Sequence, residues 1–329
     1  MTGHRFPFHH LPDDLYSKVL EIMDHYDIIL YSFVSKKAYS MAKTLRLPIS
    51  SVKILMTANP EIILQIGVTS ISFRLIMRTD RIPMASLDYL PVRVRVVKGG
   101  VQREIAQLII SNQGMTIGEW IKHLCSISDK DTLYEARFYT GIIKCDIQSH
   151  PNTFPKLRII YISCPRGAIH EDDILTAHNV LRAFLPDAQN VTLHDVPLPK
   201  DLSFQHIGMA NLKVLKIDPP SILVFDDLST WNVENCTIHL NQMPLRELNR
   251  FFKLWMKGSN PRLKKLRVSV WDTEIIPDCN VLLKGLKAKA EYVYEESKKY
   301  TIKNCRRIRA EIKIDTSDDS ADFVLTVLN

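Results

Sequence analysis

Short apolar segments that recur along the second half of the chain constrain its fold most. From residue 154 such a segment returns after roughly twenty to thirty-five residues, a spacing typical of stacked repeat arrays. The segments are FPKLRIIYISC, AQNVTLHDVPL, ANLKVLKIDPP, VENCTIHLNQM and NPRLKKLRVSV. Helical periodicity lies between the first pair (DDILTAHNVLRAFLP) and between the last pair (PLRELNRFFKLWMKG). Each unit is therefore predicted to be a strand followed by a return segment.

This pattern resembles degenerate leucine-rich repeats, in which parallel strands stack edge to edge and each unit buries its neighbour's apolar face. The C-terminal stretch differs from the repeats. Its segment NVLLKGLKAKAEYVYEESKKY has the periodicity of an amphipathic helix. The segments YTIKNCRRIRAEIKID and ADFVLTVLN alternate like a terminal pair of strands, which could close the array.

The segment from about residue 48 to 147 also alternates in the manner of strands. Four strands are predicted there, in SSVKILM, TSISFRLIM, LPVRVRVVKG and REIAQLII. Residues 116–127, TIGEWIKHLCSI, change to helical spacing with one apolar face. We expect a mixed, β-rich region.

The first forty-five residues have helical periodicity. Pro12 suits the first turn of a helix, because its missing N–H would be unpaired there anyway, and so a helix should begin near it. The apolar stripe of this helix is Leu15, Val19, Ile22 and Met23, widened by Leu20. Asp27 is predicted to cap a second helix and Ser35 a third. A module of about forty residues cannot bury so many apolar side chains alone, so some must face the rest of the chain or another protein.

The order Leu11-Pro12-Asp13, Leu15, Val19-Leu20, Met23, Asp27-Ile28, Leu30 and Val34-Ser35-Lys36 resembles an F-box, the motif by which substrate receptors dock on the Skp adaptor of cullin-based SCF ubiquitin ligases. The resemblance covers about residues 6 to 46. The adaptor contacts that it implies are Leu11, Pro12, Leu15, Leu20, Ile28, Val34 and Ser35. The alternative to an F-box is a purely structural role, in which these helices form a cap that covers one end of the β-rich body.

Residues 243–268, MPLRELNRFFKLWMKGSNPRLKKLRV, are similar to the segment that marks the type 2 F-box associated domain of the large nematode-type F-box families. Together the two resemblances imply a non-catalytic substrate receptor without cofactors, acting in the cytoplasm or nucleus. Its partners would be a Skp adaptor, through it a cullin, and an unknown protein substrate. The alternative is a repeat-type interaction scaffold that does not engage the ubiquitin machinery.

We therefore expect an α+β or α/β fold, with a three-helix F-box followed by a β-rich body of leucine-rich-repeat-like strand-helix units. The expected domains are residues 1–47 for the F-box, 48–150 for the mixed β-rich region, and 151–329 for the repeat-like F-box associated domain with its capping strands.

Composition excludes several function classes. The 329 residues are 46% hydrophobic and 24% charged, as in an ordinary globular protein, and neither a membrane-spanning stretch nor a signal peptide is evident. The six cysteines never form C-x-x-C, which indicates neither a zinc module nor a secreted disulfide framework. No phosphate-binding, dinucleotide-binding, zinc-protease or nucleophile-elbow motif is present, so an enzyme of recognised mechanism is not expected.

Few residues suggest chemistry. His170-Glu171-Asp172-Asp173 could be an acid-base or metal cluster, but acidic residues before an apolar helical stretch are ordinary first-turn residues. The adjacent His9 and His10 would point to opposite sides of an extended segment, which disfavours a ligand pair. The four tryptophans are expected mainly in the core, although one of them could anchor a substrate peptide.

The formal net charge of +7 is concentrated near the C-terminus. The basic residues there are Lys284, Lys287, Lys289, Lys298, Lys299, Lys303, Arg306, Arg307, Arg309 and Lys313. Three interpretations compete: a solvated face, a patch for an acidic protein substrate, and nucleic-acid binding. Interleaved glutamates such as Glu291 and Glu311 weigh against nucleic acid, because they would repel phosphates.

Overall fold

The structure is a computed structural model that describes residues 12–78, 86–100, 104–129, 131–142, 152–165, 170–197, 204–218, 228, 230–240, 245–271, 278–293, 297–317 and 320–328. The chain divides into two compact units. The first comprises Met1–Ala136 with His150–Pro155, and the second comprises Arg137–Ser149 with Lys156–Asn329.

Three short helices open the first unit, as predicted: α1 (Asp13–Ile22), α2 (His25–Tyr31) and α3 (Lys36–Leu45). Pro12 precedes α1, and the Ser35 hydroxyl accepts a hydrogen bond from the Ala38 N–H, 3.1 Å away, at the start of α3. The prediction that Asp27 caps the second helix is wrong. Asp24 holds that position, because its carboxylate accepts from the Tyr26 N–H at 2.8 Å, and Asp27 lies in the first turn.

A sheet in the order β6-β1-β2-β3-β4-β5 forms most of the rest of the first unit, and its strands β1 to β5 pair antiparallel. Its strands are β1 (Ser51–Met56), β2 (Glu61–Ile66), β3 (Thr69–Ile76), β4 (Arg93–Gly99), β5 (Glu104–Ser111) and β6 (Leu133–Tyr139), the last of which spans the boundary between the units. The four predicted strands are all present, and β2 and β6 were not predicted. The predicted helix is α4 (Ile117–Ser126), which begins at a capping box between Thr116 and Glu119 and buries Trp120 against the sheet.

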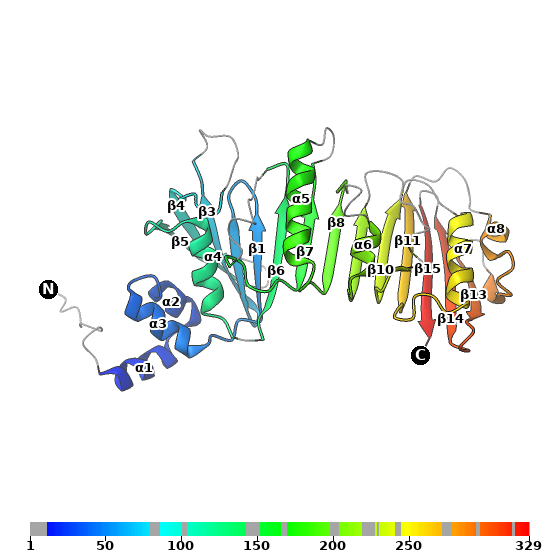
Figure 1. Cartoon of the computed structure of the whole chain (residues 1–329). Helices are drawn as coiled ribbons and strands as arrows, with labels where there is room; N and C mark the ends of the chain where they lie inside the picture. The colour runs from blue at the N-terminus through cyan, green and yellow to red at the C-terminus, as the bar shows by residue number, and fades with distance from the viewer. Residues whose placement is uncertain are drawn as a thin grey trace. The chain divides into compact units, whose positions relative to one another are not determined.

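Five parallel strands form the centre of the second unit, and each lies in one of the five recurring segments. They are β7 (Ile159–Ser163), β8 (Asn190–His194), β9 (Val214–Asp218), β10 (Asn235–Leu240) and β11 (Lys265–Trp271), paired in chain order. The return helices α5 (Glu171–Phe184), α6 (Phe204–Met209) and α7 (Leu245–Met256) lie over one face of the sheet (Figure 1). Alternate residues of β7 to β10 are buried on that face, as the strand period of two requires.

The C-terminal strands continue this sheet in the order β11-β15-β14-β13-β12. The predicted pair is present, since β14 (Arg309–Ser317) and β15 (Ser320–Leu328) are antiparallel neighbours and β15 pairs with β11. The predicted helix over NVLLKGLKAKAEYVYEESKKY is wrong. Of the described residues in this segment, those of α8 (Cys279–Leu283) are helical, and Gly285 and Lys287 then adopt positive φ angles of 77° and 51°. The chain turns there into β12 (Lys289–Val293) and β13 (Ser297–Lys303).

Two buried asparagines hold the loops of the second unit. Asn260, with a φ angle of 52°, donates to the carbonyls of Leu228 (2.7 Å) and Trp231 (2.9 Å). Asn249 on α7 donates to the carbonyls of Leu282 (2.6 Å) and Lys284 (2.9 Å), which ties α7 to α8. Within the described ranges, no helix has both the length and the apolar character needed to span a membrane.

Candidate functional site

The helices α1 to α3, called the helical module below, are fixed to the rest of the first unit by an aromatic stack. The His123 ring of α4 lies between Phe33, at a centroid distance of 4.1 Å, and Tyr39, at 4.3 Å. Phe33 also packs on Trp120 at 4.6 Å. The Ser32 hydroxyl donates to the Ile29 carbonyl at 2.6 Å, so its oxygen is available to accept a hydrogen bond from His123 Nε2 at 2.8 Å. This part of the module surface therefore packs against the rest of the same chain.

Electrostatics at this junction follow from its burial. Desolvation lowers the pKa of His123 from 6.5 to about 4, so the ring is neutral near pH 7. At the edge of the junction, Lys98 of β4 contacts both carboxylate oxygens of Asp24 at 3.0 Å. That hydrogen bond is the main reason why the pKa of Asp24 is lowered. The junction favours neutral His123 and ionised Asp24.

The module also exposes apolar side chains. Leu15 is 45% exposed and Ile22 is 85% exposed on α1, and Val34 in the turn before α3 is 60% exposed. Helix α1 rests on its opposite face, where Tyr16 and Leu20 are fully buried. The Tyr16 ring lies 6.0 Å from Tyr31 of α2. Because solvent exposure of aliphatic side chains is unfavourable, a face of this kind fits a partner surface.

The predicted adaptor contacts occupy two environments. Pro12, Leu15, Val34 and Ser35 are exposed, whereas Leu20 and Ile28 are buried inside the module. The Ser35 hydroxyl also serves as the cap of α3. Leu11 lies outside the described residues. The sequence stripe had grouped Leu15 with Ile22, and these two are the most exposed apolar residues of α1.

Two protein-family models match the chain, and one of them covers this surface. Residues 8–50 match the family model described as F-box domain. The chain carries an F-box. A second model, described as F-box associated, matches residues 203–268, which run from α6 to β11. A search of curated proteins and a search of solved structures each found no match to the chain.

An F-box implies binding of a Skp adaptor within an SCF ubiquitin ligase, and the two matched domains belong to a non-catalytic family. The F-box helices expose apolar side chains, and an exposed apolar surface is what a motif that acts by docking requires. The matched F-box associated segment supplies three of the five parallel strands of the second unit.

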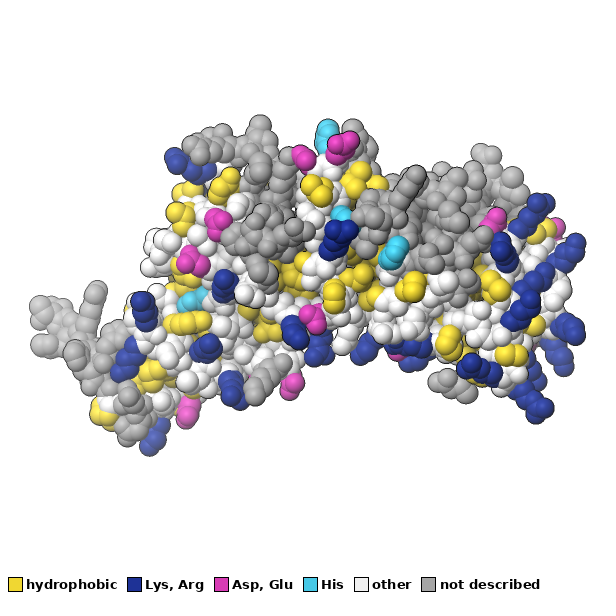
Figure 2. All heavy atoms as spheres, viewed as in Figure 1, with side chains coloured by type: hydrophobic (Ala, Val, Ile, Leu, Met, Phe, Trp, Pro, Cys, Tyr) yellow, Lys and Arg dark blue, Asp and Glu magenta, His cyan; other side chains and the backbone are white. Residues whose placement is uncertain are grey.

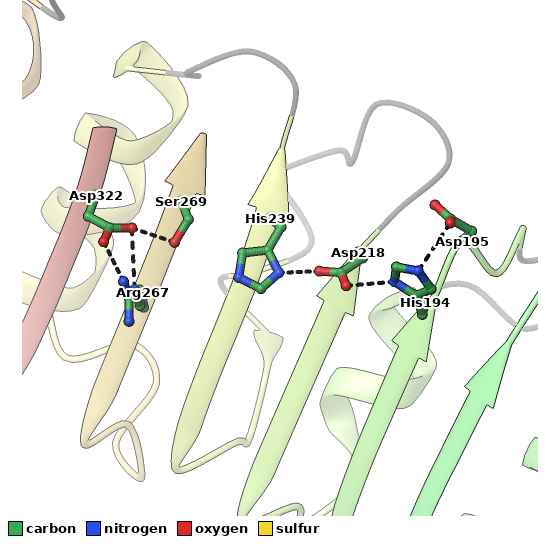
Figure 3. A network of polar contacts seen from close by, with 7 residues as sticks. All are labelled: His194, Asp195, Asp218, His239, Arg267, Ser269 and Asp322. Carbon is green, nitrogen blue, oxygen red and sulfur yellow. Dashed lines mark hydrogen bonds and ion pairs between the residues drawn. The ribbon is translucent and has the colours of Figure 1, made fainter. Parts of the chain in front are cut away.

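A row of polar side chains crosses the sheet face of the second unit that the helices leave uncovered (Figure 3). Asp218 at the end of β9 accepts from His194 Nδ1 on β8, 2.8 Å away, and from His239 Nδ1 on β10. Asp195 lies 3.4 Å from the other ring nitrogen of His194. One carboxylate therefore joins three adjacent strands.

The row continues on β11 and β15. Asp322 accepts hydrogen bonds from Arg267 and from the Ser269 hydroxyl (Figure 3). Desolvation raises the pKa of Asp322, but the hydrogen bonds from Arg267 and Ser269 outweigh that effect, and its pKa is lowered. Sequence reasoning missed this network. Part of its signal was the polar residue that follows the last buried position in each of VTLH, LKID and CTIH.

Among the described residues, no Ser or Cys side chain is hydrogen-bonded to His194 or His239, and no group of three or more His, Cys, Asp or Glu side chains is placed to hold a metal ion. His170 precedes α5, where its N–H donates to Asp173 at 3.2 Å, so the acidic cluster forms an ordinary helix start. Trp120, Trp231 and Trp255 are buried, while the side chain of Trp271 lies outside the described residues, as do His9 and His10.

Proposed function

We propose that this protein is a substrate receptor of an SCF-type ubiquitin ligase. Its F-box docks on a Skp adaptor and through it on a cullin, and its C-terminal domain holds a target protein. The single observation that supports this proposal best is the exposed apolar face of α1 and of the turn before α3, in a segment that matches the F-box domain.

The proposed adaptor surface consists of Pro12, Leu15, Val34 and Ser35 as direct contacts, extended by Ile22. Leu20 and Ile28 act from inside the module, where they hold α1 and α2 in place. Leu11 completes the predicted set at the start of the helix. Burial of a leucine-sized side chain contributes about 1.5–3 kcal/mol, so each of these anchors can contribute as much to docking as a typical hot-spot residue.

The body of the protein presents the target. We interpret the strand-helix units of residues 151–329 as degenerate leucine-rich-repeat-like units, a view that the parallel pairing of β7 to β11 supports. Residues 1–47 and 48–150 are proposed as the F-box and a linking β-rich domain. The receptor raises the effective concentration of target lysines near the activated ubiquitin, in the cytoplasm or nucleus.

Co-purification with a Skp adaptor tests this proposal. Leu15→Asp places a charge on the exposed face of α1, and the desolvation of that charge opposes docking. We expect binding to fall by at least about thirtyfold, as for a hot-spot residue. Val68→Asp is the matched control, because Val68 is an aliphatic residue of the same unit, 76% exposed and outside the F-box match.

The outcomes separate receptor from scaffold. If wild type and Val68→Asp capture the adaptor and Leu15→Asp does not, the receptor function is supported. Failure of the wild type to bind any Skp adaptor would contradict it and favour the alternative of a repeat-type interaction scaffold. Leu15 is exposed, so Leu15→Asp should keep the wild-type melting temperature and remain a fair test.

A further inference from the structure

Three separate segments bring basic side chains to one end of the second unit. Lys253 and Lys257 lie at the end of α7, Lys284 and Lys287 follow α8, and Arg306 and Arg307 occupy the turn between β13 and β14. We call these six residues the basic surface. All six are exposed, and Figure 2 shows Lys and Arg side chains gathered at this end of the unit.

Contacts between the segments show that they meet. The Cys305 N–H donates to the Met256 carbonyl at 2.7 Å, which places the β13–β14 turn on the end of α7. A Cβ added at Gly285 would lie 3.4 Å from Lys253 Cε, so the segment after α8 runs beside the same helix. The Asn249 side chain reinforces that contact through the Leu282 and Lys284 carbonyls.

The basic surface is not neutralised by the acidic residues that the structure describes. None of its six side chains forms an ion pair with any acidic residue that the structure describes. Nearby lysines behave differently. Lys299 lies 2.7 Å from Glu311 and 3.2 Å from Glu291, and Lys313 lies 2.8 Å from Asp315. Unpaired like charges repel one another at short distance. Binding of an anionic partner would relieve this repulsion and is therefore electrostatically favourable.

The turn that carries Arg306 and Arg307 is rigid. Asn304 Oδ1 accepts from the N–H groups of Arg306 and Ile308, both at 2.9 Å, and the Asn304 N–H donates to the Ile308 carbonyl at 3.0 Å. Arg307 holds a φ angle of 66°, where glycine would be favoured. The backbone that carries the two arginines is thus held in place before binding, which reduces the entropic cost of ordering this turn on an encounter.

The chemistry of the surface favours protein over nucleic acid. Binding of single-stranded nucleic acid uses exposed aromatic side chains for base stacking. Beside Arg307, the exposed large apolar side chain that the structure describes is aliphatic, Ile308 at 40%. Cations around an aliphatic residue match a segment in which acidic and aliphatic residues are mixed.

We propose that the basic surface is the site where the receptor recruits an acidic segment of its target protein. The identification of the bound segment as part of a ubiquitination target rests on the proposed function. The charge complementarity between the basic surface and an acidic segment is independent of that function. The site lies apart from the F-box, in the other compact unit.

Fluorescence anisotropy with the full chain tests this site. The probe is a short labelled peptide of mixed glutamate and leucine, and the same peptide with glutamine for glutamate is its neutral counterpart. The test variant is Arg306→Gln with Arg307→Gly, in which glycine suits the positive φ and should leave the melting temperature unchanged. Lys216→Gln is the matched control, since Lys216 is exposed on the uncovered face of β9.

We expect the double variant to weaken binding of the acidic peptide by about three- to tenfold, as for the loss of two exposed charge contacts, and Lys216→Gln to leave it unchanged. Added salt should weaken the wild type more than the variant. No binding of the acidic peptide, equal binding of the neutral peptide, or an equal loss in Lys216→Gln would overturn the proposal. Tighter binding of oligothymidylate, lost in the double variant, would replace the protein partner by a nucleic acid. Adaptor capture is unaffected in each case, so the two proposals fail independently.

Discussion

A single methyl group at Gly208 is expected to destabilise the F-box associated segment. Gly208 lies inside α6, where replacement by alanine ordinarily stabilises a helix by about 1 kcal/mol. Here an added Cβ would lie 2.4 Å from both Cδ1 and Cγ of the Trp231 ring. Attractive carbon contacts need about 3.5–4.0 Å, so the ring would have to move by more than about 1 Å.

The ring has little freedom to make that movement. Trp231 is 4% exposed, and the chain beside it is held by the Asn232 N–H, which donates to the Gly208 carbonyl at 2.7 Å. Asn260 holds the Trp231 carbonyl from the other side. Overpacking of this kind costs about 1–3 kcal/mol or more, which exceeds the gain in helix propensity. We expect Gly208→Ala to lower the free energy of unfolding by about 2 kcal/mol.

Thermal and urea unfolding followed by circular dichroism measure this effect. A loss of about 2 kcal/mol corresponds to a melting temperature lower by about 4–8 °C for a unit of this size. Trp231→Leu in the same background tests the cause, because removal of the ring should make the added methyl group nearly neutral. If Gly208→Ala were as stable as the wild type, the packing argument would be refuted.

Three further predictions concern other buried groups. Burial lowers the pKa of His123 to about 4, so as the pH falls from 6.5 towards 4 the unfolded chain binds a proton that the folded chain does not. The urea midpoint should fall across that window, and fall less in His123→Phe. Asn249→Ala leaves two carbonyls without their donor and should cost about 2–3 kcal/mol in urea unfolding. Burial raises the pKa of Cys236, and that of Cys125 to about 12, so mass spectrometry after iodoacetamide treatment should find exposed Cys305 alkylated well before these two.

Local patterns predicted most elements of the fold. The five recurring segments each contain one of the parallel strands, because the alternation of buried and exposed residues is a property of each strand alone. Capping chemistry likewise placed the start of α3 at Ser35. The start of α2 was misplaced because Asp24 and Asp27 both suit an N-cap, and the choice depends on where α1 ends.

Tertiary pairing decided the elements that the sequence could not. Residues 280–300 have helical periodicity, yet β13 pairs along its whole length with β14, and that pairing outweighs local propensity. The His194–Asp218–His239 contacts arise from three strands in register, and register is not visible in any one segment. The exposed part of the F-box was predicted only in outline, because the stripe of α1 does not reveal which half faces α2 and α3.

The connection between the F-box and the first sheet has a mechanical consequence. Leu47 lies two residues after the end of α3, and its N–H donates to the Ile127 carbonyl at the end of α4, 3.2 Å away. His123 is also packed between two aromatic rings. Together these contacts mean that residues 46–50 do not act as a flexible linker between the F-box and the sheet. An adaptor bound to the F-box would therefore be connected rigidly to the first sheet. Any change of orientation that is needed to reach different target lysines must come from elsewhere in the ligase or from the target.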